Sequence, residues 1–177
     1  MKTNKSRKRL CSALLCLILA VSMLPITGYA NGGDIAINET NFPDAAFKTY
    51  VATFDTDSSG SLSQAEIAAV TEIEVRRQNI NSLKGIEYFT SLEELECSGN
   101  YLEELDVSAL TRLKTLECSD NPLIESLDVS YNKELVKLYC ENHFRQGSLS
   151  RLIFGENNTV LDDLICSNNR LQELDIR

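Results

Sequence analysis

The chain has 177 residues, with 17 basic and 26 acidic side chains and a formal net charge of −9. This length suits one domain, with or without a small appendage. The excess of acidic side chains argues against nucleic acids and anionic membrane surfaces as partners, and it favours cations or basic protein surfaces.

Residues 1–30 have the features of a secretory leader. Five basic residues precede an apolar run of 15 residues, Leu10–Leu24, and Pro25 and a small-x-small sequence ending at Ala30 follow it. This order predicts a signal peptide that is cut after Ala30. An uncleaved anchor is the alternative, but a bilayer-spanning helix needs about 20 apolar residues. The mature chain contains no further segment of that kind, so we expect a secreted or cell-surface protein without a transmembrane segment.

Removal of the leader makes the protein more acidic. The leader holds five of the 17 basic residues and none of the acidic ones, so 12 basic residues then face 26 acidic residues, a net charge of −14. A solvated acidic surface is common, and this charge alone identifies no ligand.

The segment 31–72 is predicted to form a small cap of two helices around a polar loop. Apolar residues recur at helical spacing before the loop, at Phe47, Tyr50, Val51 and Phe54, and after it, at Ile67, Val70 and Ile73. Each set places its side chains on one helical face. A helix–loop–helix with an apolar face suits a lid that covers one end of a larger structure.

The loop DTDSSGSLSQAE, residues 55–66, matches the ligand pattern of an EF-hand calcium loop. Such a loop takes ligands at positions 1, 3, 5, 7, 9 and 12 and a glycine at position 6. Gly60 falls on position 6, where a left-handed turn is needed. The six ligand positions hold Asp55, Asp57, Ser59, Ser61, Ser63 and Glu66. With three carboxylates and no second loop to pair with, calcium binding is expected to be weak, in the range of about 10⁻⁴–10⁻³ M.

The alternative is that this loop only starts a helix. Ser63 and Glu66 have the spacing of a capping box, which accounts for those two residues. A capping box does not explain why Asp55, Asp57 and Gly60 occupy their positions, so calcium binding is the favoured interpretation. A dockerin-type module would carry two such loops in tandem and is disfavoured, because the sequence has one.

Residues 73–177 are built from a repeat of about four to five turns. The segments LEELECSGNYLEELDV, LKTLECSDNPLIESLDV, LVKLYC and LDDLICSNNRLQELDI follow the frame L-x-x-L-x-C-x-x-N-x-L. Alternate residues of a short strand point the same way, so the leucines and cysteines face inward. One turn cannot bury its leucines alone, whereas stacked turns form a continuous core. The expected fold is an α/β solenoid with parallel strands on its concave face, preceded by the helical cap.

Four cysteines occupy one repeat position, at Cys97, Cys118, Cys140 and Cys166. An even count in a secreted protein favours disulfides, but side chains that project side by side suit the disulfide dihedral poorly. Ligands in a line cannot surround one metal ion tetrahedrally. A buried thiol also lacks the exposure and the basic partner of a nucleophile. We therefore predict a stack of buried free thiols and no enzymatic activity.

An asparagine follows the cysteine by three residues in three of the turns. These asparagines, Asn100, Asn121 and Asn169, are predicted to bond backbone groups of the turn after each strand. After Cys140 the pattern is interrupted, because His143 takes that place and about four extra residues follow. A bulging loop is the simple interpretation, and a contact loop that uses Phe144 and Arg145 is the alternative.

These repeats closely resemble the leucine-rich-repeat family. The sequence motif CS-x-N-x-L-x-x-LDVS is similar to repeats of secreted and surface proteins of Gram-positive gut bacteria. The helical segment before the repeats is similar to the EF-hand-like cap of internalin-like proteins. The resemblance implies a curved solenoid whose concave face binds a partner. Since the chain stops in mid-repeat at LQELDIR, we expect a truncated chain.

We therefore expect a monomeric binding module with a calcium-stabilised cap and a protein or glycan partner on its concave face. The residues expected on that face are Glu94, Glu96, Glu117, Lys137, Tyr139, Glu141, Asp163 and Ile165. The alternative is the N-terminal recognition part of a larger secreted enzyme whose catalytic domain is absent from this chain. The sequence after Arg177 would discriminate between the two.

Overall fold

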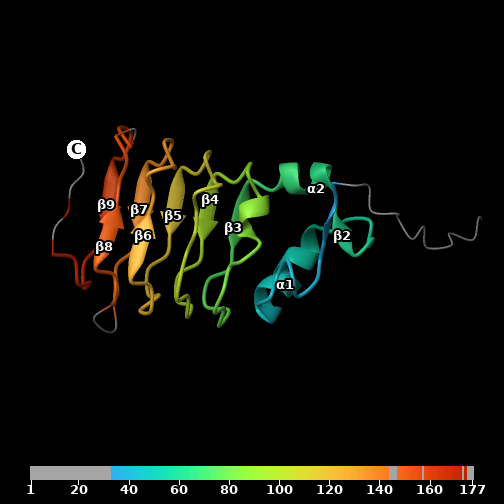
Figure 1. The fold of residues 1–177 in the computed structure, drawn as a ribbon, viewed down its shortest axis with the longest axis horizontal. Coiled ribbons are helices and arrows are strands. Elements are labelled where there is room, and N and C mark those ends of the chain that lie inside the picture. The colour runs from blue at the N-terminus through green and yellow to red at the C-terminus, as the bar shows by residue number, and fades with distance from the viewer. Residues whose placement is uncertain (1–32, 144–146, 157, 173, 175–177) are drawn as a thin grey trace, which may run out of the picture.

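The computed structural model describes residues 33–143, 147–156, 158–172 and 174. The predicted signal peptide, with Phe144 and Arg145 of the predicted contact loop, lies outside these residues. Figure 1 shows an elongated stack of short strands in chain order, with helices α1 and α2 at the end where the described chain begins.

Five short parallel strands form the main sheet. They are β3 (Glu72–Glu74), β4 (Glu94–Glu96), β5 (Thr115–Glu117), β7 (Lys137–Tyr139) and β9 (Asp163–Ile165), hydrogen-bonded in the order β3-β4-β5-β7-β9. The register sets the central residue of each strand beside that of the next, as in Leu95 beside Leu116. The predicted solenoid of parallel strands is therefore confirmed.

The central side chain of each strand points into the core. Ile73, Leu95, Leu116 and Leu138 are all buried, because the flanking residues of each three-residue strand alternate to the other side. Leu164 of β9 is only partly buried. Among the described residues β9 is the last strand of this sheet, and Leu164 is covered on one side only, by β7.

The cysteines also follow the predicted stack. All four are free thiols; Cys97, Cys118 and Cys140 are buried, whereas Cys166 in the last turn is only partly covered. Burial raises the pKa of the Cys140 thiol to about 12, and it raises the pKa of Cys97 and Cys118 as well. These thiols are therefore protonated at neutral pH and pack as small apolar groups.

The asparagines bond backbone groups of their own turn, as predicted, and they also link that turn to the preceding one; Asn100 and Asn121 are buried. The Asn100 Nδ2 donates to the carbonyls of Val75 and Cys97, both at 2.8 Å. Its Oδ1 accepts two backbone N–H groups of the preceding turn. Asn121 and Asn169 likewise donate to the cysteine carbonyls of their own and the preceding turn. Each side chain thus satisfies buried backbone groups that the strands leave unpaired.

A second parallel sheet pairs β6 (Ser126–Asp128) with β8 (Arg151–Ile153). The repeat frame did not predict it. Asn132, three residues after Val129, donates to two backbone carbonyls of the preceding turn at 2.8 Å each. The asparagine of the sequence L-D-V-S-x-N at 127–132 therefore links neighbouring turns beside the second sheet, as the asparagine of C-x-x-N does beside the main sheet.

The N-terminal segment contains two short helices and a two-stranded sheet. Its elements are β1 (Ile35–Ala36), α1 (Ala45–Val51), the 3₁₀ turn η1 (Ala52–Phe54), β2 (Ser61–Leu62) and α2 (Gln64–Ala69). The Asp44 carboxylate caps α1 by accepting two backbone N–H groups of its first turn, and Ser63 with Glu66 forms a capping box on α2. A further 3₁₀ turn, η2 (Ile86–Tyr88), belongs to the first turn of the solenoid.

This segment packs directly on the first turn of the solenoid. The Phe42 ring lies edge-on to Tyr88, with centroids 5.8 Å apart, and Phe54 meets Phe89 at 5.7 Å. Gly85 has φ of +102°, and a Cβ there would lie 2.3 Å from Cδ1 of Phe42. Only glycine allows this approach. One continuous hydrophobic core therefore joins the N-terminal segment to the repeats.

Candidate functional site

The outward side chains of the main sheet form two rows, which together make up the sheet face. The first row contains Glu72, Glu94, Thr115, Lys137 and Asp163. The second row contains Glu74, Glu96, Glu117, Tyr139 and Ile165. Neighbouring members of a row are separated by one strand spacing, about 4.8 Å, so each row presents its side chains as one surface.

Seven of the eight residues predicted for this face lie in these rows. The eighth, Glu141, lies in the turn after β7, where its carboxylate accepts the Ser167 hydroxyl at 2.9 Å and lies 3.2 Å from Nε2 of His143. The second row changes along its length from three glutamates to Tyr139 and Ile165. The face is therefore acidic at the N-terminal end and partly apolar at the other.

Arg76 is the basic residue that meets this acidic row. Its Nη2 lies 2.5 Å from Oε2 of Glu96. Burial acts to raise the pKa of Glu96, but hydrogen bonds from Arg76 and Ser98 outweigh it and hold that pKa below its usual value. Glu96 is therefore a carboxylate that already has its partner.

Glu117, the next residue in the row, has the opposite environment. Burial raises its pKa, repulsion from Glu96 adds to the effect, and hydrogen bonds from Ser119 offset only part of it. A carboxylate with a raised pKa gains when a cation approaches, because the cation favours its charged form. Arg76 lowers the pKa of Glu117 only in part, and no residue that the structure describes forms an ion pair with this carboxylate.

Tyr139 and Asp163 are joined across neighbouring strands. The Tyr139 hydroxyl donates to Oδ2 of Asp163 at 2.5 Å, and this bond raises the pKa of the phenol. The bond holds the Tyr139 ring beside the neighbouring strand and uses one acceptor site of the Asp163 carboxylate. His143, which takes the place expected for an asparagine, lies exposed beside Asp120 and Glu141, and Asn142 is the buried residue of that turn.

The predicted calcium loop brings its three carboxylates together. One oxygen each from Asp55, Asp57 and Glu66 lies within 4.8 Å of the others. Asp55 accepts the backbone N–H groups of Ser59 and Gly60, and Asp57 also accepts that of Ser59. Gly60 has the expected left-handed φ, +80°. Carboxylate oxygens are ligands that hard divalent cations prefer, and a full calcium shell takes six to eight oxygen atoms.

The serines of the loop lie beside this cluster. The Ser59 hydroxyl donates to the carbonyl of Ser61 at 2.9 Å, and the Ser63 hydroxyl donates to Glu66 at 2.8 Å. All six predicted ligand residues therefore belong to one compact hydrogen-bonded loop. Calcium at this site would be held by Asp55, Asp57 and Glu66, with oxygen atoms of the serines to complete the shell.

Glu66 forms the capping box that the sequence offered as one alternative, and its carboxylate also lies in the cluster with Asp55 and Asp57. Its Oε2 accepts from Ser63 in the capping box, and its Oε1 accepts both the backbone N–H and the hydroxyl of Thr56 at 2.7 Å. These bonds, led by the backbone N–H of Ser63 and then those from Thr56, lower its pKa to about 2. The bonds to Thr56 hold the glutamate over the loop, and nothing in the sequence indicated them.

A short strand from the start of the described chain supports the loop. Strand β1 pairs antiparallel with β2, with Ile35 beside Leu62 and Ala36 beside Ser61. The sequence contains no second loop to pair with β2, and β1 occupies that edge instead. Leu62 is fully buried, so this pairing ties the loop to the hydrophobic core.

Comparison with known proteins assigns the fold. The stacked parallel strands, inward leucines and bridging asparagines define a leucine-rich-repeat solenoid, and residues 90–132 match a family model described as leucine rich repeats in two copies. An internalin of Listeria monocytogenes is similar in structure, with 21% identity over 80% of this chain and a TM-score of 0.56. Internalin C2 of the same organism matches with 21% identity over 81% of this chain and a TM-score of 0.58.

The chain spans 48% of the first of these solved structures and 72% of the second. Among curated proteins, none matches significantly. In the described part of the chain, every helix is too short or too polar to cross a membrane. The protein thus has an internalin-like leucine-rich-repeat fold, an architecture that presents an extended surface for protein binding.

Proposed function

We propose that this protein is a secreted or cell-surface binding module whose sheet face takes a protein partner through a basic patch. The observation that supports this proposal is the row Glu74, Glu96 and Glu117, in which Arg76 pairs with the middle member alone. Complementary charge steers association and selects among partners. The predicted leader, residues 1–30, would bring the module outside the cell.

The arrangement of the face favours a partner that carries basic and apolar side chains together. The glutamates would receive lysine or arginine side chains, and Ile165, 38% exposed, would contact an apolar group beside them. Tyr139 supplies the aromatic surface that protein interfaces favour. A neutral glycan is the less favoured partner for this face, because it brings no positive charge to offset the repulsion among neighbouring carboxylates.

We also propose that calcium binding at Asp55, Asp57 and Glu66 stabilises the cap. The convergence of the three carboxylates supports a cation there, and the contacts of Glu66 show that the loop is also closed by hydrogen bonds of its own. The cation would relieve repulsion among the carboxylates rather than build the loop. This proposal predicts a modest gain in stability and a cap that keeps its fold in a chelator.

Selection of peptides tests the binding proposal. A library of random peptides displayed on phage is selected against the purified protein at low ionic strength, and the enriched sequences are compared with the starting pool. We expect enrichment of lysine and arginine next to apolar residues, and a loss of affinity of at least about tenfold when Glu94 and Glu117 are changed to lysine.

The matched control places the same charge reversal elsewhere. Glu103→Lys with Glu104→Lys adds the same charge at two exposed residues outside the main strands. These changes should leave the affinity of the selected peptides nearly unchanged. Enrichment without a basic bias, or equal losses in both double variants, would refute the sheet face as the binding surface.

A further inference from the structure

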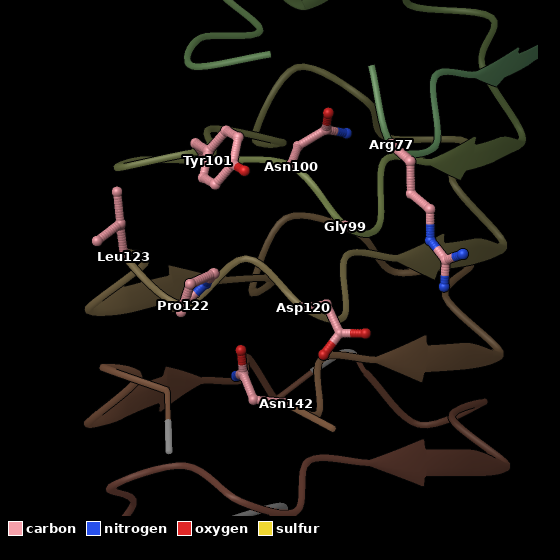
Figure 2. A pocket seen from close by; sticks show the side chains of 8 residues that line it. All are labelled: Arg77, Gly99, Asn100, Tyr101, Asp120, Pro122, Leu123 and Asn142. Carbon is pink, nitrogen blue, oxygen red and sulfur yellow. The ribbon is translucent and has the colours of Figure 1, made fainter. Parts of the chain in front are cut away.

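A pocket on the loop edge of the solenoid lies apart from the sheet face (Figure 2). It has a volume of about 400 Å³ and lies where the turns leave β3, β4, β5 and β7. Its walls include Arg77, Gly99, Tyr101, Asp120 and Leu123. This volume is within the range of small-molecule sites, about 300–1,000 Å³, and the sequence pattern gave no indication of it.

The pocket has an apolar side that is open to solvent. Tyr101 is 51% exposed and Leu123 is 46% exposed, and Figure 2 shows both at the same end of the pocket with Pro122. Large apolar side chains that gather at a concave surface mark a binding site more often than isolated ones do. An aromatic ring in this position offers a flat surface against which a ligand can stack.

One wall of the pocket carries a positive charge. Arg77 is exposed, and its guanidinium forms no ion pair with any residue that the structure describes. The stem of Arg77 crosses Gly99, where an added Cβ would lie 2.7 Å from its Cγ. The missing side chain at Gly99 thus provides the space that lets Arg77 border the pocket.

The other wall carries a negative charge held in a fixed orientation. Oδ1 of Asp120 accepts the backbone N–H of His143 at 2.7 Å, and Oδ2 lies 3.1 Å from Nδ1 of the same residue. Each carboxylate oxygen keeps a second lone pair, so Asp120 can still accept from a ligand. Arg77 and Asp120 come from turns two strand spacings apart, and the Arg77 side chain crosses the turn between them at Gly99, so both charged groups border the same pocket.

The two opposite charges restrict the chemistry of the ligand. An anion would be attracted by Arg77 and repelled by Asp120, and a cation would meet the reverse situation. A purely apolar group would leave both charges to be desolvated without a partner. A pyranose ring is neutral, and its hydroxyl groups both donate and accept, so it can pair with Arg77 and Asp120 while its C–H face rests on Tyr101.

We propose that this edge pocket binds a neutral sugar unit of a glycan. Tyr101 stacks against the sugar ring, Arg77 donates to one hydroxyl group and Asp120 accepts from another. The site is separate from the sheet face, so the protein carries two recognition surfaces. This inference does not depend on the partner proposed for the sheet face.

The proposal is tested with the purified protein on an array of oligosaccharides. The array presents neutral hexose and N-acetylhexosamine termini beside sialylated and uronic-acid termini, and the strongest neutral saccharide is then titrated in solution. We expect binding to neutral termini and a loss of at least about tenfold in affinity for Tyr101→Ala and for Arg77→Ala. Thermal melting verifies that both variants, which change exposed side chains, remain folded.

Two further variants sharpen the test. Tyr131→Ala removes a tyrosine that is 58% exposed outside the pocket, and it should leave sugar binding unchanged. Asp120→Asn removes the negative wall, and it should allow uronic-acid saccharides to bind at least about tenfold more tightly than they bind the unmodified protein.

Several results would overturn the proposal. These are no binding to any neutral saccharide, equal losses for Tyr101→Ala and Tyr131→Ala, or a pocket that takes an apolar peptide or a free amino acid in place of the sugar. A salt titration separates the last possibility, because an amino acid held by two ion pairs weakens with added salt whereas a neutral sugar does not.

Discussion

Oδ2 of Asp44 accepts the backbone N–H of Asn81 at 2.8 Å, while Oδ1 of the same carboxylate caps helix α1. One side chain therefore starts the first helix and ties it to the first turn of the repeats. Burial acts to raise the pKa of Asp44, but the backbone N–H groups, led by Asn81, outweigh it and hold the pKa below its usual value. The N-terminal segment is thus a structural part of the solenoid.

The first prediction concerns this double function of Asp44. Asp44→Ala removes a helix cap and a long-range hydrogen bond together, so the free energy of unfolding should fall by about 1–3 kcal/mol. Urea denaturation measures the change. Asp106→Ala is the matched control, because the bonds of Asp106 within the described residues go to the nearby Ser108. A loss as large as that of Asp44→Ala would argue against a stabilising bond between Asp44 and Asn81.

The second prediction concerns the glycine at the junction. Gly85→Ala combines an unfavourable left-handed backbone with a clash against Phe42, so unfolding free energy should fall by about 2–5 kcal/mol. Gly60→Ala is the control, since φ there is +80° but no atom lies within 4 Å of the added Cβ. It should cost only the backbone strain, about 1–2 kcal/mol, when both variants are denatured with urea in a chelator. Equal costs would mean that the junction tolerates a side chain at Gly85.

The repeat frame predicts the strands and the inward leucines because both depend on local alternation and period. The position of Asn100 is predictable for the same reason, since its function repeats in each turn. The pairing of β6 with β8 was missed although the L-D-V-S-x-N sequence was visible. L-D-V-S occurs at 105–108 and at 127–130, but the asparagine follows it only in the second, so the complete motif could not be compared between turns.

The contacts of the N-terminal segment are not predictable in the same way. The approach of Gly85 to Phe42 and the bond from Asn81 to Asp44 join residues far apart in sequence, and neither leaves a local pattern. The edge pocket was not predictable either. Its two opposite charges, Arg77 and Asp120, come from different turns, and the repeat pattern does not distinguish these turns. The loop carboxylates were predictable, because a ligand pattern lies within 12 consecutive residues.

The third prediction uses the low pKa of Glu66. A carboxylate whose pKa is depressed to about 2 in the folded protein, against 4.5 ordinarily, stabilises the fold above pH 4.5. That contribution is lost as the pH falls from about 4.5 to about 2. In a chelator, Glu66→Gln should therefore flatten this part of the stability profile, whereas Glu103→Gln should not. If the free energy of unfolding depends on pH in the same way in the unmodified protein and in Glu66→Gln, the bonds from Thr56 and Ser63 do not stabilise the charged form of Glu66.

The fourth prediction concerns calcium. At ten times its dissociation constant, calcium should add about 1.4 kcal/mol to the free energy of unfolding, which corresponds to about 3–6 °C in the melting temperature. Asp55→Ala with Glu66→Ala should remove this gain. Since Glu66 also caps α2, Asp57→Asn is the cleaner variant, because it keeps a hydrogen-bond acceptor and removes one charge. Equal melting temperatures with calcium and with chelator would contradict the proposed site.

The most direct measurement maps where a selected basic peptide binds. Backbone amide chemical shifts are recorded by NMR as the peptide is added to the protein, first unmodified and then with Glu117→Lys. We predict that the largest shift changes fall on β4, β5 and β7, and that they disappear in the variant at the same peptide concentration. Changes that centre on the turns around Tyr101, or that persist in Glu117→Lys, would contradict the sheet face as the surface that recognises the partner.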